Sequence, residues 1–240
     1  MADSKQVDKA AVEKALESLK TYDWGTDRKT LKPIDDAVVA THGDAAARKE
    51  LETRLAAVLA TGASRSAKDF ACRTLMIIGT ADSVPALAAL LPDKDLSHMA
   101  RYALERIPAP EAAKALRDAL PKLSGALKVG VIGSLGARRD HESVRALCML
   151  AALAKGAVAA AAAGALGDIG TPEAAGALRH APALEPAVAD ALLACAERLL
   201  ADGKKAEAIV IYKSLAGEGY SKQVRLAATR GLLSAAGKHD

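Results

Sequence analysis

Residues 160–179 read AAAAGALGDIGTPEAAGALR, and this stretch decides the fold. Leu166 and Leu178 lie 12 positions apart, on either side of the run Gly-Thr-Pro-Glu at 170–173. Glycine commonly ends a helix, and threonine followed by proline and an acidic residue is typical of the first turn of the next one. The stretch therefore predicts a helix, a tight turn and a second helix.

The same separation of two leucines recurs along the chain. The pairs are 75/87, 104/116, 135/147 and 166/178, and successive pairs begin 29, 31 and 31 residues apart. A looser fifth unit has Leu199 and Ile211, and a sixth begins at Leu233. Self-similarity at this period indicates a helical solenoid, in which each hairpin buries its apolar face against the next.

The composition favours helices throughout. Aromatic residues make up 2% of the chain, whereas apolar residues as a whole make up 51% and include many alanines. Alanine favours helix and lets neighbouring helices approach closely, and no run of β-branched or aromatic residues has the length of a strand. We predict an all-α protein.

Three segments resemble HEAT repeats, particularly the short bacterial kind: ALGDIGTPEAAGAL (165–178), LMIIGTADSVPALAALL (75–91) and VRLAATRGLL (224–233). The resemblance covers roughly residues 64–237 and implies a right-handed α-solenoid of HEAT-like hairpins. Residues 1–63 lack the leucine spacing and are predicted to form three amphipathic helices that cap the array. The expected organisation is a helical cap at 1–63 and a repeat array at 64–240, whose last repeat is incomplete.

The N-terminal residues, together with ACRTLMIIGT (71–80) and LSHMARYALERIP (96–108), resemble HEAT regions of large exported bacterial multidomain proteins. That resemblance implies a scaffold. We therefore expect a non-catalytic protein-interaction module that binds a protein partner along a concave face formed by the second helix of each hairpin. The candidate partner-binding residues on that face are Arg117, Lys122, His141, Arg145, Arg179 and His180.

Metal-dependent catalysis is not expected. Deoxyhypusine hydroxylase, a HEAT-repeat enzyme, binds two irons through several His-Glu pairs, whereas this chain has the single pair His141-Glu142. A two-metal site needs several converging ligands. We therefore predict no catalytic residue, no metal ligand and no cofactor. The HEAT-like phycobilin lyases share the short repeat, but no motif here marks a bilin site.

A nucleic-acid-binding protein of the alkylpurine DNA glycosylase type is the alternative function. That activity calls for a basic groove with aromatic side chains that hold a displaced base. Here 33 basic residues are interspersed with 29 acidic ones, and the one tryptophan, Trp24, lies in the predicted cap. Nucleic acid is therefore not the expected partner.

No apolar run reaches the length of a membrane span, so no membrane contact is expected. The first residues, MADSKQVDKA, precede no hydrophobic segment and show no signal peptide. The chain as written is expected in the cytoplasm, and in the periplasm or outside the cell if it is part of a larger exported protein.

Two further expectations concern cysteine and the C-terminal helix. Cys72, Cys148 and Cys195 lie in apolar helical contexts without metal-ligand spacing, and we interpret them as buried free thiols. Residues 220–237 carry apolar residues on more than one helix face, so the segment predicts weak self-association. Replacing Leu233 with glutamate should then favour the monomer if that side chain faces outward.

Overall fold

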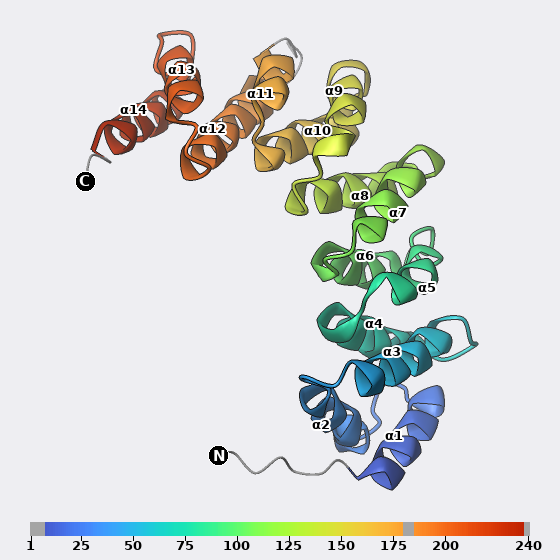
Figure 1. Ribbon diagram of the computed structural model, residues 1–240. Helices are drawn as coiled ribbons and strands as arrows, with labels where there is room; N and C mark the ends of the chain where they lie inside the picture. Colours follow the sequence, from blue (N-terminus) through green and yellow to red (C-terminus); the bar gives the residue numbers. More distant parts are fainter. Residues whose placement is uncertain (1–7, 180–184, 238–240) are drawn as a thin grey trace. The chain divides into compact units, whose positions relative to one another are not determined.

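The computed structural model describes residues 8–179 and 185–237, and within these ranges the chain forms α-helices, short 3₁₀ turns and loops, with no strand (Figure 1). The described residues contain fourteen α-helices. No described helix is both long and apolar enough to cross a membrane. The helices are α1 (Lys9–Thr21), α2 (Lys32–Ala40), α3 (Ala45–Leu59), α4 (Arg65–Ile78), α5 (Val84–Ala88), α6 (Ser97–Arg106), α7 (Pro110–Ala119), α8 (Gly125–Ala137), α9 (Val144–Leu153), α10 (Gly156–Ile169), α11 (Pro172–Arg179), α12 (Glu185–Ala201), α13 (Lys205–Leu215) and α14 (Lys222–Gly237).

The chain divides into two units, Met1–Leu123 and Ser124–Asp240. In the first unit α1 packs on α2, α3 on α4, α4 on α6 and α5 on α7. In the second, α10 lies between α8 and α12, and α14 packs on α12 and α13 (Figure 1). Helices thus contact mostly their neighbours along the chain, as in a helical array. The all-α prediction is confirmed, and three helices do form within residues 1–63; that this segment is a cap stays a prediction.

The paired leucines occupy the centre of the packing. All eight side chains of the four pairs have 0% exposure, and each pair belongs to one hairpin: α4 with α5, α6 with α7, α8 with α9, and α10 with α11. Leu199 on α12 and Ile211 on α13 are 0% and 1% exposed. The spacing of 12 therefore marks the residues that each hairpin buries against its neighbours.

The turn within residues 160–179 forms as its sequence predicts. Gly170 follows α10 with φ 68°, a left-handed conformation that glycine adopts without a steric penalty. The Thr171 hydroxyl oxygen accepts a hydrogen bond from the Ala174 amide at 3.0 Å, and α11 begins at Pro172. Threonine is thus the N-cap and proline the first helical residue.

A preceding helix also supplies polar partners to the turn of the next hairpin. The Glu52 side chain on α3 is 1% exposed, and its carboxylate accepts hydrogen bonds from the Thr80 and Ser83 amides at 2.6 and 3.2 Å. Arg48, one turn earlier, donates from Nε to the Ile78 carbonyl at 2.7 Å. In the second unit Arg139 donates in the same way to the Ile169 carbonyl. These bonds satisfy backbone groups that a helix end leaves free.

Small residues set the close approach of helices in the second unit. A β-carbon at Gly136 would lie 2.9 Å from the Ala165 Cα atom of α10, and one at Gly167 would lie 2.6 Å from the Ala191 carbonyl oxygen of α12. The two glycines are 31 residues apart, which is the repeat spacing. Helices α8, α10 and α12 therefore pack backbone to backbone, and this accounts for the small residues of the opening stretch.

Leu233, taken from the sequence as the start of a sixth unit, differs from its counterparts because its side chain is 69% exposed. On α14 the buried positions are Ala228 and Ala235. The exposure meets the condition set for the Leu233→Glu test, and self-association through residues 220–237 stays a prediction.

Two glycines of α10 should respond oppositely to a single methyl group. We expect Gly167→Ala to destabilise the fold by about 1–3 kcal/mol, because the new β-carbon meets the α12 backbone. A β-carbon at Gly164 would meet no atom within 4 Å, so Gly164→Ala should stabilise the fold by up to about 1 kcal/mol through helix propensity. Urea unfolding followed by circular dichroism measures both; equal effects of the two substitutions would contradict the close packing of α10 on α12.

Candidate functional site

The first unit contains an open pocket between the loop that follows α1, helix α2 and helix α4. Its volume is about 810 Å³, within the range of about 300–1,000 Å³ typical of ligand sites. We call it the Trp24 groove. The residues that define it here are Tyr22, Trp24, Arg28, Val39, Phe70 and Ile77.

The groove gathers exposed apolar side chains in a chain that is otherwise poor in aromatic residues. Trp24 is 94% exposed, and Val39 on α2 and Ile77 on α4 are also exposed. The only tryptophan, the only phenylalanine and one of the four tyrosines line this one pocket. Such a cluster is the kind of surface that marks a binding site in a soluble protein.

The loop that carries Trp24 is fastened to the start of α4. The Ser64 hydroxyl donates to the Tyr22 carbonyl at 2.5 Å, and the Ser66 hydroxyl donates to Asp23 Oδ1 at 3.2 Å. The same Asp23 oxygen accepts the Trp24 amide at 2.8 Å. These bonds hold the backbone of Trp24 in place while its side chain points into solvent.

Asp23 is the acceptor at the centre of this loop. The backbone N–H of Trp24 lowers the pKa of the Asp23 carboxyl below its usual value of 3.8, and the Ser66 hydroxyl lowers it further. Both donors favour the ionised carboxylate. The loop is therefore held most firmly when Asp23 carries its charge.

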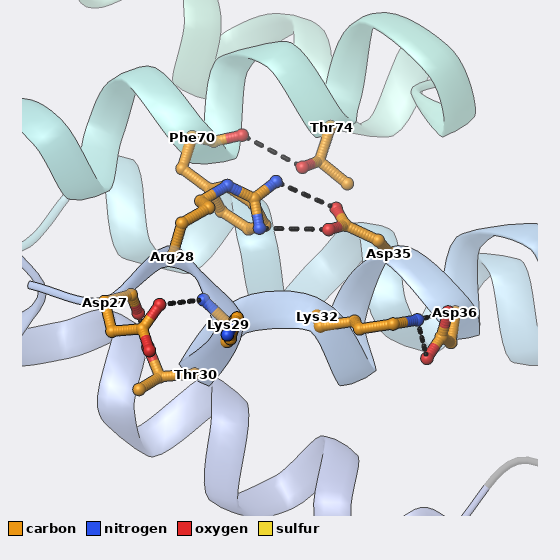
Figure 2. A network of polar contacts seen from close by, with 9 residues as sticks. All are labelled: Asp27, Arg28, Lys29, Thr30, Lys32, Asp35, Asp36, Phe70 and Thr74. Atoms are coloured by element: carbon orange, nitrogen blue, oxygen red, sulfur yellow. Dashed lines mark hydrogen bonds and ion pairs between the residues drawn. The ribbon is translucent and has the colours of Figure 1, made fainter.

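Arg28 is one of the residues that line the groove. Figure 2 shows it beside Phe70 of α4 and Asp35 of α2. Its guanidinium group lies over the Phe70 ring, with the Cζ atom 4.6 Å from the ring centroid. The same group donates two hydrogen bonds to the Asp35 carboxylate on α2, at 2.9 and 3.2 Å. The planar guanidinium group of arginine can contact both oxygens of a carboxylate while its face lies over an aromatic ring, a geometry that the compact ammonium group of lysine does not offer. Arg28 thereby links the loop, α2 and α4.

The second charge pair of the groove lies on α4. Arg73 donates from Nε to Asp69 Oδ2 at 3.0 Å, one helical turn earlier. Both arginines in the lining are thus paired with aspartates of the lining. The groove therefore combines an apolar surface with charges that are already neutralised.

The residues predicted from sequence to bind a partner lie elsewhere. In the first unit Arg117 is half-buried on α7 and Lys122 is exposed just after it; in the second, His141, Arg145 and Arg179 are exposed. His180 lies outside the described residues. None of the described five lines the Trp24 groove. Their contact with a protein partner stays a prediction.

Groups with metal or nucleophilic chemistry are not assembled within the described residues. No group of three or more His, Cys, Asp or Glu side chains there is placed to hold a metal ion. Burial raises the pKa of the Cys72 thiol to about 12 and that of Cys195 to about 11, so both stay protonated at neutral pH. Cys148 is half-buried. The prediction of buried free thiols is confirmed for Cys72 and Cys195.

The sequence did carry a signal for the groove, in the segment YDWGTDR at 22–28. A tryptophan between an aspartate and a glycine lies in a turn, where helix packing cannot bury it. The sequence-based interpretation of this segment as part of a structural cap did not take this into account.

No protein-family model matches the chain, and no curated protein matches it.

The pH dependence of the loop follows from the lowered pKa of Asp23. A carboxyl whose pKa is lower in the folded loop stabilises that loop above pH 3.8 and loses the effect as the pH falls through the lowered value. We expect the fluorescence anisotropy of Trp24 to be high at pH 7 and to fall below about pH 3.8, before helix content is lost. Asp23→Ala should lower the anisotropy at pH 7.

Asp36→Ala is the matched control, because Asp36 contacts Lys32 on the solvent side of α2. It should leave the anisotropy unchanged. Equal anisotropy for Asp23→Ala and the unaltered chain at pH 7 would contradict a loop held by Asp23.

Proposed function

We propose that this chain is a non-catalytic protein-binding scaffold, built as an α-solenoid of HEAT-like hairpins. Two observations support the architecture: the leucine pairs are fully buried, one pair per hairpin, and the helices pack on their neighbours along the chain. Arrays of this kind expose long surfaces that bind other proteins.

The observation that carries the functional part is the exposure of Trp24 on a fastened loop. Tryptophan is among the residues that contribute most to protein interfaces, because it buries a large rigid surface. A side chain on an ordered backbone also loses less entropy on binding than one on a mobile loop. Trp24, with Val39 and Ile77 across the groove, thus forms a preorganised apolar docking site.

The occupant that fits this groove is a peptide segment of another protein with large, uncharged apolar side chains. The two arginines and their aspartates neutralise each other within the lining, so a charged anchor would be buried there without a partner. Apolar anchors cover Trp24 and Ile77 without breaking either ion pair. Of the residues predicted from the sequence, Lys122, His141, Arg145 and Arg179 are exposed and stay candidate contacts for a partner.

Selection of peptides from a random displayed library tests this function. The enriched peptides should contain an aromatic or large aliphatic anchor, and their affinity should fall at least about tenfold with Trp24→Ala, as for a hot-spot residue. Leu153→Ala is the matched control, because Leu153 is a large apolar residue exposed on α9 and outside the groove. It should change affinity less than about twofold. Failure to enrich any peptide, or full affinity of Trp24→Ala, would refute the proposal.

Binding to DNA separates this function from the glycosylase-type alternative. With balanced charges we expect duplex DNA to bind only at the non-specific level of about 10⁻⁴–10⁻⁶ M, and more weakly as salt rises. Fluorescence anisotropy with a labelled duplex measures this. Sub-micromolar binding that survives salt above the physiological level would favour the alternative.

A further inference from the structure

The outer face of α14 is a second apolar surface, in the other unit of the chain. The buried residues Ala228 and Ala235 face the body of the unit, and a β-carbon at Gly231 would lie 2.4 Å from the Tyr212 ring of α13. Leu226 and Leu233 each precede a buried alanine by two positions, about 200° around the helix. They therefore share the opposite side of α14, and they are 61% and 69% exposed.

The packing of the preceding helices indicates what kind of element covers such a face. Helix α10 is covered by α12, where Gly167 meets the backbone at Ala191, and α12 is in turn covered by α13 and α14. Within the described residues nothing covers Leu226 and Leu233. A helix packed on α14 would continue the interface that already joins α10 to α12.

The charges of the last two helices indicate which kind of helix this face would bind. The hairpin α13–α14 contains Lys205, Lys213, Lys222, Arg225 and Arg230 against only Glu207 and Glu218. No ion pair within the described residues involves these five cations. Helix α14 itself has no acidic residue between positions 222 and 237.

A second copy of α14 is therefore a poorer match than an acidic helix, so self-association through this face is expected to be the weaker interaction. Arg230 lies between Leu226 and Leu233 in the sequence of the helix, so two copies paired through their leucines would bring cations together. A helix with acidic residues would instead neutralise them. Arg225 adds a buried Nε atom that has no hydrogen-bond partner among the described residues.

We propose that the outer face of α14 binds an amphipathic helix of another protein, in which leucine-sized residues seven positions apart are flanked by acidic residues. The leucines would pack against Leu226 and Leu233, and the carboxylates would pair with Lys222 and Arg230. The site is separate from the Trp24 groove and does not depend on the function proposed for it.

Two helical peptides with the same leucine pattern test the proposal by fluorescence polarisation on the full chain. One has glutamates beside the leucines and the other has lysines in the same places. The glutamate peptide should bind at least about tenfold more tightly, and its affinity should fall as salt screens the charges. Arg230→Glu should reverse the preference between the two peptides. Equal binding of both peptides would overturn the proposal.

The apolar part is tested with Leu233→Ala and its control Leu153→Ala, each an exposed leucine of the same unit. Leu233→Ala should lower the affinity for the glutamate peptide about tenfold, as expected for the loss of a buried leucine contact. Leu153→Ala should leave this affinity unchanged. Trp24→Ala should also leave this affinity unchanged, so failure at one site is distinguishable from failure at the other. Unchanged affinity of Leu233→Ala would overturn the proposal.

Two further measurements distinguish an acidic helix from a second copy of the chain and from a nucleic acid as the molecule bound to α14. They are sedimentation of the chain alone and competition by duplex DNA. We expect a monomer at the concentrations at which the glutamate peptide binds, and no displacement of that peptide by DNA. A dimer at these concentrations that Leu233→Ala dissociates would make a second copy the occupant. Displacement by DNA would make it a nucleic acid, and either result would overturn the proposal.

Discussion

A hairpin of two short helices cannot bury its own leucines, and the structure depends on this constraint. Leu75 and Leu166 are fully buried only because helices from neighbouring hairpins lie over them. The same dependence extends to polar groups: Glu52 on α3 satisfies the amides of a turn that lies about thirty residues later in the chain. Within a unit, these hairpins are thus completed by adjacent helices, in their apolar contacts and, at the turn after α4, in polar contacts as well.

Because the leucines of the hairpins are buried, an apolar surface that no helix covers is informative about binding. Most of the buried apolar residues are alanine or leucine, and the chain has few aromatic residues to expose. Trp24 nevertheless stands in solvent on a loop fixed by Ser64, Ser66 and Asp23. Holding a large apolar side chain in water on an ordered backbone stabilises nothing in the free chain. The exposure of Trp24 on an ordered loop is explained if a partner covers this side chain on binding. The proposed function therefore rests on Trp24.

The sequence predicted the parts of the fold that depend on local spacing. A separation of 12 between leucines identified the hairpins, and Thr171 with Pro172 identified the start of α11. The groove could not be predicted in this way, because it forms where the loop at 22–28 packs on a helix about forty residues further along the chain. The exposure of Leu233 likewise depends on which side of α14 meets Tyr212, which the leucine spacing does not encode. The basic residues chosen from the sequence do not line this groove, and their part in partner binding stays a prediction.

We propose that a partner peptide binds by covering Trp24 in its groove. Because the chain has one tryptophan, its indole N–H gives a single signal in a nitrogen–proton correlation spectrum. During titration with a selected peptide, the account predicts that this signal shifts together with the methyl signals of Val39 and Ile77, with a common dissociation constant. Binding that shifts signals elsewhere in the chain and leaves the Trp24 indole unchanged would contradict it.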